Sequence, residues 1–568
     1  MGMGACNAID RVLASIGAGS PQKPSFTPCL DVQNGGVLLA LPALQATGLL
    51  RHTNHFFKLP QGYYGIESIF TLLGFMALCR VKTVEDLRYL PPGEWGKMLG
   101  LDRIPEVKTL REKLAILASQ GTEAEWNAKL CKEWMEASPE GAGVLYIDGH
   151  VRVYHGSQTK LPRHYVSRER LAQRATVDYW INALDGQPFF KINQAVDPGL
   201  VEVLKKEIVP YLKETIPNQP TAEELEADQA LHRFTLVFDR EGYSPDMFRD
   251  LKLERIACHS YHKFPGTDWL ASEFTTHTLN LPHRVIPSIM LAERGTQLSN
   301  DMWVRECRRL SETQHQTAIL STNYKSAMVP IAAGMLCRWS QENFFKYMRE
   351  HYNLDKLVDH QTAAINETTK VVNPTYRDLE GKIKKVAALQ VRSRAKFGSL
   401  HLLGPIDEAG VKKFEEEKAR VLEAITSQEV ELLDLKAIRK ATKRHIKFSE
   451  MPEEKRFRQL STHSKHLVDT IKMIAYRAET AMVNIVREKM TREDDARAFV
   501  RSVYNATVDI IPVPETNELH VKVHHAANNM SDEAVRALCA ELTETETTYP
   551  GTELRLVYSL ISDSKKLL

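Results

Sequence analysis

The chain has 568 residues, and its 74 Lys and Arg against 72 Asp and Glu exclude a strongly basic or acidic protein. Hydrophobic residues at 43% and charged residues at 26% are typical of a soluble globular chain with several domains. Eight scattered cysteines without a CxxC pair argue against a disulfide framework and favour the cytoplasm. The longest apolar run near the start, 36–50, is interrupted by Pro42 and is too short to span a bilayer, so we expect no membrane attachment.

Residues 1–135 are predicted to be a mainly helical region that includes a possible DNA-binding segment. Apolar patterns predict helices over 65–81, 83–90 and 105–120, with Thr83 as the N-cap of the second. Short helices joined by a turn are typical of a helix-turn-helix DNA module. An ordinary helical packing domain fits the same pattern equally well.

The pattern changes to an alternation of period two at residue 143, which opens a predicted α/β domain over 136–375. The segment 143–150 is predicted to be a strand that ends at Asp148. The segment 150–156 alternates in the same way, so we expect a hairpin that turns at Asp148 and the following glycine.

A second strand of this domain is predicted to end at Asp239, because three apolar residues lead directly into that acid. Ser244 is the predicted N-cap of the short helix that follows. Residues 263–318 are predicted to be β-hairpins inserted into the domain, and 326–357 are predicted to form one or two helices.

The predicted remainder consists of a long-helix region over 376–492 and a small α+β unit over 493–568. One long helix is expected over 410–448. Its last part has six cations at helical spacing with no acid between them: Lys436, Arg439, Lys440, Lys443, Arg444 and Lys447. Most charged helix faces are merely solvated, but six like charges in one stripe favour a polyanionic partner, so we expect these residues to bind DNA.

Asp148 and Asp239 are candidate catalytic residues because ligands bind beyond the carboxyl ends of strands in α/β sheets. Hard cations such as Mg²⁺ take oxygen ligands, and a site for two ions needs a third carboxylate. The candidate is Glu342, which shares a predicted helix face with Arg338, Lys346 and Arg349. An ordinary ion-paired glutamate is the alternative interpretation.

Two other sets of residues are weaker candidates for a metal site. A zinc site can be imagined from side chains whose spacing fits no usual pattern: Cys258, His259 and His262 with His277, His283 or Cys307. Four acids compete with Glu342 as the third carboxylate: Glu241, Glu293, Glu306 and Glu312. We set Glu241 aside because it is so close to Asp239 in the chain.

Three segments, YIDGH, VFDREGYS and RWSQENFFKYMRE, resemble the acidic signatures of DDE transposases of bacterial insertion sequences, closest to the IS4-like group. In that group the third signature is Tyr, two residues, Arg, three residues, Glu, six residues, Lys. Arg338 and Glu342 match it, Arg349 replaces the lysine, and Met335 stands where the tyrosine is expected. The resemblance covers roughly 143–375.

The resemblance implies a ribonuclease-H-like α/β catalytic core with a β-rich insertion, flanked by a mainly α-helical N-terminal region and a helical plus small α+β C-terminal region. It implies that Asp148, Asp239 and Glu342 bind two Mg²⁺ ions, with Mn²⁺ as a substitute, and that Arg338, Lys346 and Arg349 hold DNA phosphates. The implied activity is cleavage at transposon ends and strand transfer, by a homodimer on double-stranded DNA in the nucleoid of the bacterial cytoplasm. A related nuclease without joining activity, or a catalytically silent DNA-binding derivative, remains the alternative.

Overall fold

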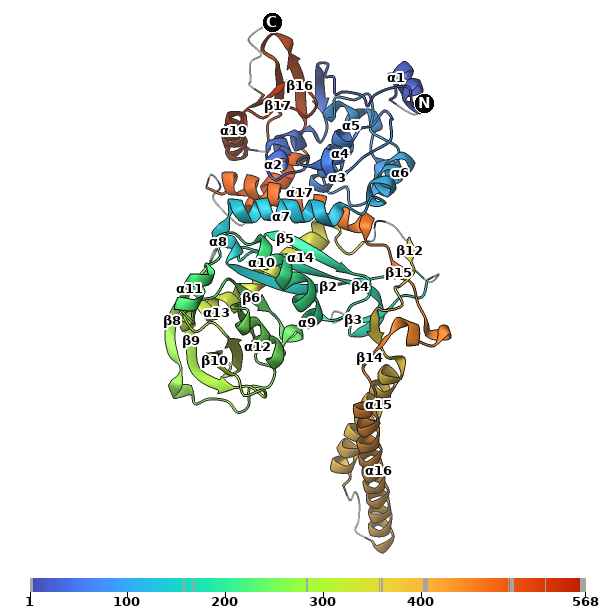
Figure 1. Ribbon diagram of the computed structural model, residues 1–568, viewed down its shortest axis with the longest axis vertical. Coiled ribbons are helices and arrows are strands. Elements are labelled where there is room, and N and C mark those ends of the chain that lie inside the picture. The colour runs from blue at the N-terminus through green and yellow to red at the C-terminus, as the bar shows by residue number, and fades with distance from the viewer. Residues whose placement is uncertain are drawn as a thin grey trace.

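The computed structural model describes residues 4–156, 159–166, 169–281, 284–356, 358, 361–401, 407–488, 490, 495–526 and 528–561. The protein is a mixed α/β structure with a large central sheet, a smaller sheet near both ends of the chain, and a helical hairpin that protrudes from the body (Figure 1). In the described residues no helix is long and apolar enough to cross a membrane.

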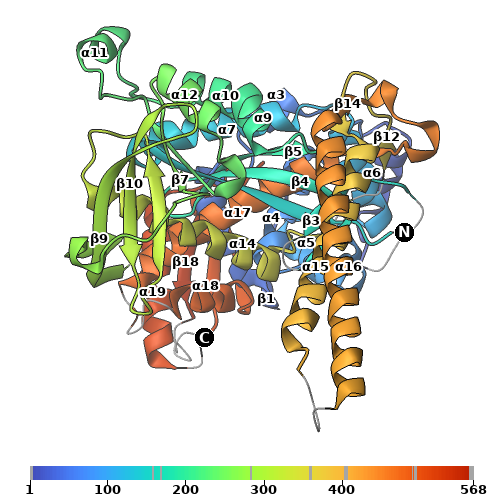
Figure 2. The ribbon, with the colours of Figure 1, turned by 90° about the horizontal axis from the view of Figure 1, so that it is seen from below.

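The central sheet has ten strands in the order β3-β4-β2-β6-β7-β11-β10-β9-β8, with β5 paired to β4. Its first half consists of β2 (Val144–Val153), β3 (Arg163–Val166), β4 (Leu171–Asn182), β5 (Pro188–Gln194), β6 (Thr235–Phe238) and β7 (Ala257–Tyr261). Strands β5, β4 and β2 are antiparallel neighbours, whereas β2, β6 and β7 are parallel. Helices α10 (Val209–Thr215) and α12 (Pro245–Leu253) cover one face and α14 (Arg338–Tyr352) the other (Figure 2).

The hairpin predicted around Asp148 and Gly149 is not formed, because the chain does not turn there. Strand β2 continues to Val153, and its pairing with β4 runs without a break from Tyr146 to Val153. Because every residue from Tyr146 to Val153 has a partner on β4, an extended strand keeps ladder pairing that a turn at Asp148 would interrupt. The hairpin prediction from the Asp-Gly pair was therefore wrong.

The region predicted to hold β-hairpins, 263–318, contains antiparallel strands that extend the central sheet. Strands β8 (Thr275–Leu281), β9 (Arg284–Gln297), β10 (Trp303–Leu310) and β11 (Gln316–Ser321) form an antiparallel meander. Strand β11 also pairs with β7, so the insertion adds its strands to the edge of the sheet. Two helices follow, α13 (Met328–Leu336) and α14, as the sequence allows.

Both ends of the described chain meet in the smaller sheet. Strand β1 (Cys29–Val32) pairs with β16 (Val508–Val513), which is followed by β17 (Glu518–Val523) and β18 (Arg555–Leu560). Helix α4 (Ile66–Leu78) forms as expected, and Thr83 caps the next turn, with Asp86 accepting a hydrogen bond from its N–H. That turn, η2 (Val84–Tyr89), is a 3₁₀ helix, whereas α6 (Val107–Ala118) is α-helical.

Helices α7 (Glu123–Ala137) and α17 (His463–Arg487) lie between this terminal part and the central sheet (Figure 1). A fully buried ion pair fastens α17 to the sheet: Lys191 of β5 pairs with Asp469 of α17. Within the sheet, Arg152 of β2 pairs with Asp178 of β4 at 2.8 Å, and Asp178 lies 4.0 Å from Lys191. Buried ion pairs of this kind cost desolvation energy and demand accurate geometry, so they fix the position of the helix on the sheet.

Helices α15 (Pro374–Ser399) and α16 (Glu408–Ala441) pack side by side and protrude from the body as an arm (Figures 1 and 2). Ile383 and Val386 meet Leu432 along the seam of the arm. At its base, β13 (Lys370–Val372) pairs with β14 (His445–Lys447). The helix predicted over 410–448 therefore ends at Ala441, where Thr442 adopts an extended conformation and the chain enters this pairing.

Candidate active site

The register of two parallel strands brings Asp148 and Asp239 together. The last register pair of β2 and β6 is Ile147 with Phe238, and the two aspartates are the next residue on each strand. Neighbouring residues in register on parallel strands point to the same side of a sheet. Both carboxylates therefore lie at the carboxyl end of β6, next to each other.

Arg338, the first residue of α14, places its guanidinium between these two acids. Its Nη2 atom lies 3.4 Å from Oδ2 of Asp148 and 3.9 Å from Oδ2 of Asp239. The side chains are largely enclosed, with 12% of Arg338, 21% of Asp148 and 34% of Asp239 exposed. A cation thus lies where the two carboxylates converge and reduces their mutual repulsion.

Glu342 lies one helical turn beyond Arg338 and is exposed. Its charge acts on both Arg338 and Asp148, so it lies within electrostatic range of the group formed by Asp148, Asp239 and Arg338, which we call the acidic recess. Among the described residues, three potential ligand atoms converge within 4.8 Å only at Asp31, Asp509 and His524 in the smaller sheet. The recess is therefore more open than a closed metal cage, with two carboxylates adjacent and the third approaching from the helix.

The electrostatics of the recess show the cost of gathering these acids. Burial raises the pKa of Asp148 to about 6; the negative charges of Asp239 and Glu342 act in the same direction, and Arg338 opposes them. Burial lowers the pKa of Arg338, but the surrounding carboxylates outweigh burial and raise it overall. An additional positive charge in the recess would favour the ionised form of Asp148.

Glu241 belongs to the same recess, although sequence reasoning set it aside. The 3₁₀ turn η4 (Arg240–Gly242) folds it back, with the Glu241 N–H donating to Oδ1 of Asp239 at 2.8 Å. The Tyr179 hydroxyl lies 3.3 Å from Oε1 of Glu241 and 2.8 Å from Oδ1 of Asp197. Burial and the charges of Asp197, Asp239 and Asp148 raise the pKa of Glu241 to about 7. The sequence signal that could have indicated this position of Glu241 is its spacing of two residues from Asp239, directly before Gly242.

The comparison with known families decides which class of protein this is. A family model described as "Transposase protein" matches residues 2–562, nearly the whole chain. The chain belongs to this transposase family. A search of the curated proteins found no match. DNA is accordingly the substrate of this transposase.

The remaining cations predicted on α14 of this transposase differ in their surroundings. Lys346 is exposed one turn beyond Glu342, whereas Arg349 is half-buried and its Nε donates to the carbonyl oxygen of Phe345 at 3.4 Å. The other side of the helix packs inward: Phe344 is buried, and Tyr347 donates to Glu479 of α17. The face with Arg338, Glu342 and Lys346 is the one turned toward the recess or the solvent.

The prediction that six cations form a stripe on one long helix is wrong, because α16 ends at Ala441, between the third and fourth of these residues. Lys436, Arg439 and Lys440 occupy the last turns of α16, Lys443 and Arg444 lie in the connection, and Lys447 is in β14. Five of the six are exposed and Arg439 is half-exposed, so they form a basic collar at the base of the arm. Their role in DNA binding stays a prediction.

The structure gives the candidate zinc ligands other partners. His259 lies with its Nδ1 3.1 Å from the Cys258 carbonyl oxygen, and His262 Nδ1 lies 3.0 Å from Glu306. His283 is outside the described residues. No group with Cys and His ligands converges in the part of the chain that the structure describes.

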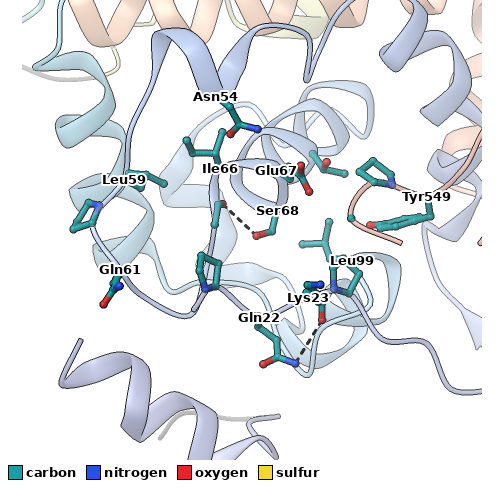
Figure 3. Close-up of a pocket in the computed structure, with 17 residues that line it drawn as sticks. Gln22, Lys23, Asn54, Leu59, Gln61, Ile66, Glu67, Ser68, Leu99 and Tyr549 are labelled. Atoms are coloured by element: carbon teal, nitrogen blue, oxygen red, sulfur yellow. Dashed lines mark hydrogen bonds between the residues drawn. The ribbon is translucent and has the colours of Figure 1, made fainter. Parts of the chain in front are cut away.

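A hollow of about 530 Å³ is lined by residues between 21 and 99 and by residues 549–551 (Figure 3). It shares no lining residue with the acidic recess. Its lining includes Pro21, Leu59, Ile66 and Tyr549, with Glu67 as its one carboxylate among the described residues. With Glu67, the cation Lys23 and otherwise polar uncharged or apolar side chains, this lining lacks the converging carboxylates that a site for two metal ions needs. The acidic recess is therefore the better candidate for catalysis.

Proposed function

We propose that this transposase is of the DDE type and that Asp148, Asp239 and Glu342 are its catalytic carboxylates. The observation on which the proposal rests is the convergence of Asp148 and Asp239 at adjacent register positions of the parallel strands β2 and β6, where β6 ends, with Arg338 between them one turn before Glu342. The order of elements supports a ribonuclease-H-like core, because the antiparallel strands β2, β4 and β5, with the short β3 at the edge of β4, are followed by α10, β6, α12 and β7.

The donor set fits Mg²⁺, with Mn²⁺ as a substitute. All candidate ligands are carboxylate oxygens, which hard cations prefer, and the Arg338 guanidinium already lies as a cation between two of them. Two divalent ions in this recess would supply activation of the attacking oxygen and stabilisation of the leaving oxygen in a displacement at phosphorus.

The protein's own groups position the DNA in this proposal. Arg338, Lys346 and Arg349 hold backbone phosphates, and such contacts orient the duplex without reading its sequence. Water cleaves the strand at a transposon end, and the freed 3′-hydroxyl attacks the target DNA. Because two ends have to be brought together, we propose a homodimer on DNA, associated with the bacterial nucleoid in the cytoplasm.

A plasmid assay tests the proposal. Supercoiled plasmid with candidate transposon ends is incubated with the full-length protein and Mg²⁺ or Mn²⁺. Joined products support transposition, and cut but unjoined ends indicate a nuclease. Intact plasmid despite DNA binding in every preparation indicates a silent derivative and overturns the enzyme proposal.

Substitutions assign the carboxylates. Asp148→Asn, Asp239→Asn and Glu342→Gln should each abolish cleavage while DNA binding stays intact. Glu350→Gln is the matched control, because this acid lies on the same helix two turns beyond Glu342, where it is 63% exposed and lies 3.7 Å from His351. If Glu342→Gln stays active while Glu241→Gln is inactive, then Glu241 is the third carboxylate.

A further inference from the structure

The second half of α15 has an unusual charge distribution that the active site does not explain. Residues 381–399 contain no acid and six cations: Lys382, Lys384, Lys385, Arg392, Arg394 and Lys396. All six are exposed. Like charges gathered on one helix repel each other, so a run of this kind is costly unless a partner with negative charge offsets the repulsion.

The neighbouring helix neutralises only two of these cations. Arg394 pairs with Glu429 of α16 at 2.7 Å, and Lys396 pairs with Glu417 at 3.0 Å. The remaining four, Lys382, Lys384, Lys385 and Arg392, have no ion pair with any residue that the structure describes. The unneutralised charge is therefore concentrated in the middle of α15.

The geometry of the arm points this charge outward. Ile383 and Val386 face α16 across the seam, and helical periodicity places Lys385 and Arg392 on the opposite side of α15. These two residues are seven positions apart, so they lie about 10 Å apart along the helix axis. The arm projects from the body, with α16 as the helix packed beside α15 (Figure 1).

We propose that the outer face of α15 binds the phosphate backbone of duplex DNA outside the active site. The four unneutralised cations match a polyanion, and the chain belongs to a family that acts on DNA. The arm rises from the collar of Lys436 to Lys447, so both basic surfaces lie on one connected element. This inference rests on the proposed function in one respect: the DNA that α15 binds is the duplex next to the point that the proposed active site cleaves.

Salt-dependent binding tests this role without any cleavage. The full-length variant Lys382→Gln, Lys384→Gln, Lys385→Gln, Arg392→Gln is compared with wild type on a linear random-sequence duplex in EDTA. The control variant, Lys205→Gln, Lys206→Gln, Lys213→Gln, Lys252→Gln, removes the same charge from exposed lysines on the body. Glutamine preserves the helix, since its helix propensity is close to that of lysine.

We expect the α15 variant to bind DNA at least tenfold more weakly at physiological salt, and the control variant to bind like wild type. The slope of log affinity against log salt should become shallower by about one for each DNA phosphate that the variant no longer neutralises. Equal affinity and slope in the two variants would overturn the proposal. Because metal is absent, failure here leaves the carboxylate assignment untouched, and failure of the carboxylate variants leaves this result untouched.

A crosslinking experiment gives an independent answer should the quadruple variant fold poorly. A photo-reactive amino acid replaces Val391, which is 67% exposed on α15, in otherwise wild-type full-length protein. A crosslink to the duplex supports the proposal. A crosslink only to a second copy of the chain shows that α15 is a dimer contact and overturns it.

Discussion

Replacing Arg338 with glutamine should make the protein bind Mn²⁺ more tightly while it lowers strand cleavage. In the structure the guanidinium lies between Asp148 and Asp239, so a divalent ion has to displace it before using their oxygens. Glutamine keeps a polar side chain but removes the competing charge. Cleavage falls because the same side chain is proposed to hold a DNA phosphate.

The magnitude follows from the distances. At an effective dielectric constant of about 20, unit charges separated by the 3.4 Å between Arg338 and Asp148 attract by about 5 kcal/mol. Partial exposure and the solvation of the freed guanidinium reduce the net value to about 1–2 kcal/mol. Because 1.4 kcal/mol corresponds to a factor of ten, the Kd for Mn²⁺ should fall by about 5- to 30-fold.

Isothermal titration of the full-length, DNA-free protein with Mn²⁺ measures this change. Arg249→Gln is the control, because Arg249 pairs with Asp246 on the exposed side of α12, away from the recess. Urea unfolding establishes that both variants are folded. Unchanged or weaker Mn²⁺ binding by folded Arg338→Gln would refute the reasoning that Arg338 competes with the metal.

Three further predictions concern stability. Burial raises the pKa of Asp148 from its ordinary value of 3.8 to about 6 in the folded protein. The contribution of this carboxyl to the unfolding free energy is therefore fully present below the ordinary pKa and is lost as the pH rises through the folded pKa. In metal-free protein, the unfolding free energy of Asp148→Asn relative to wild type should therefore rise by up to about 3 kcal/mol between pH 4 and 8 in urea titrations; an unchanged difference would contradict the assignment. Asp469→Asn removes the carboxylate that pairs with both buried Lys191 and buried Lys465, and leaves Lys191 with only Asp178 at 4.0 Å, so it should cost about 3–5 kcal/mol by urea unfolding; the exposed-pair control Asp378→Asn should cost below about 1 kcal/mol. Gly242→Ala places a Cβ 2.4 Å from the buried Phe238 ring, so it should cost about 1–3 kcal/mol in thermal unfolding and reduce cleavage by displacing the η4 turn; wild-type values for both would show that the turn adjusts freely.

Local signals in the sequence predicted much of the candidate site. The apolar run before Asp239 and the cap at Ser244 depend only on near neighbours, and the structure confirms both, with Ser244 accepting from the Met247 N–H at 3.3 Å. Helical spacing likewise predicted that Arg338 and Glu342 share a face of α14. Such features follow from propensity and periodicity within one element.

The features that were missed depend on contacts between distant segments. The strand through Asp148 continues past Gly149 because β4, from another part of the chain, pairs with it. Glu241 enters the recess through the conformation of η4 and the hydroxyl of Tyr179, neither of which has a signal in the pattern of apolar residues. The end of α16 at Ala441 is set by the pairing of β14 with β13.

The pairing of β1 with β16 has a consequence for how the protein matures on the ribosome. Residues 29–32 leave the ribosome long before their partner strand, which begins at Val508. At ordinary rates of synthesis, the intervening stretch of about 476 residues takes roughly 24 to 95 s to make. During that interval the N-terminal strand has an unpaired edge, so a prematurely terminated chain would expose it permanently. Such fragments should be prone to aggregation and to degradation, because the smaller sheet forms only after the chain has been synthesised through Val513.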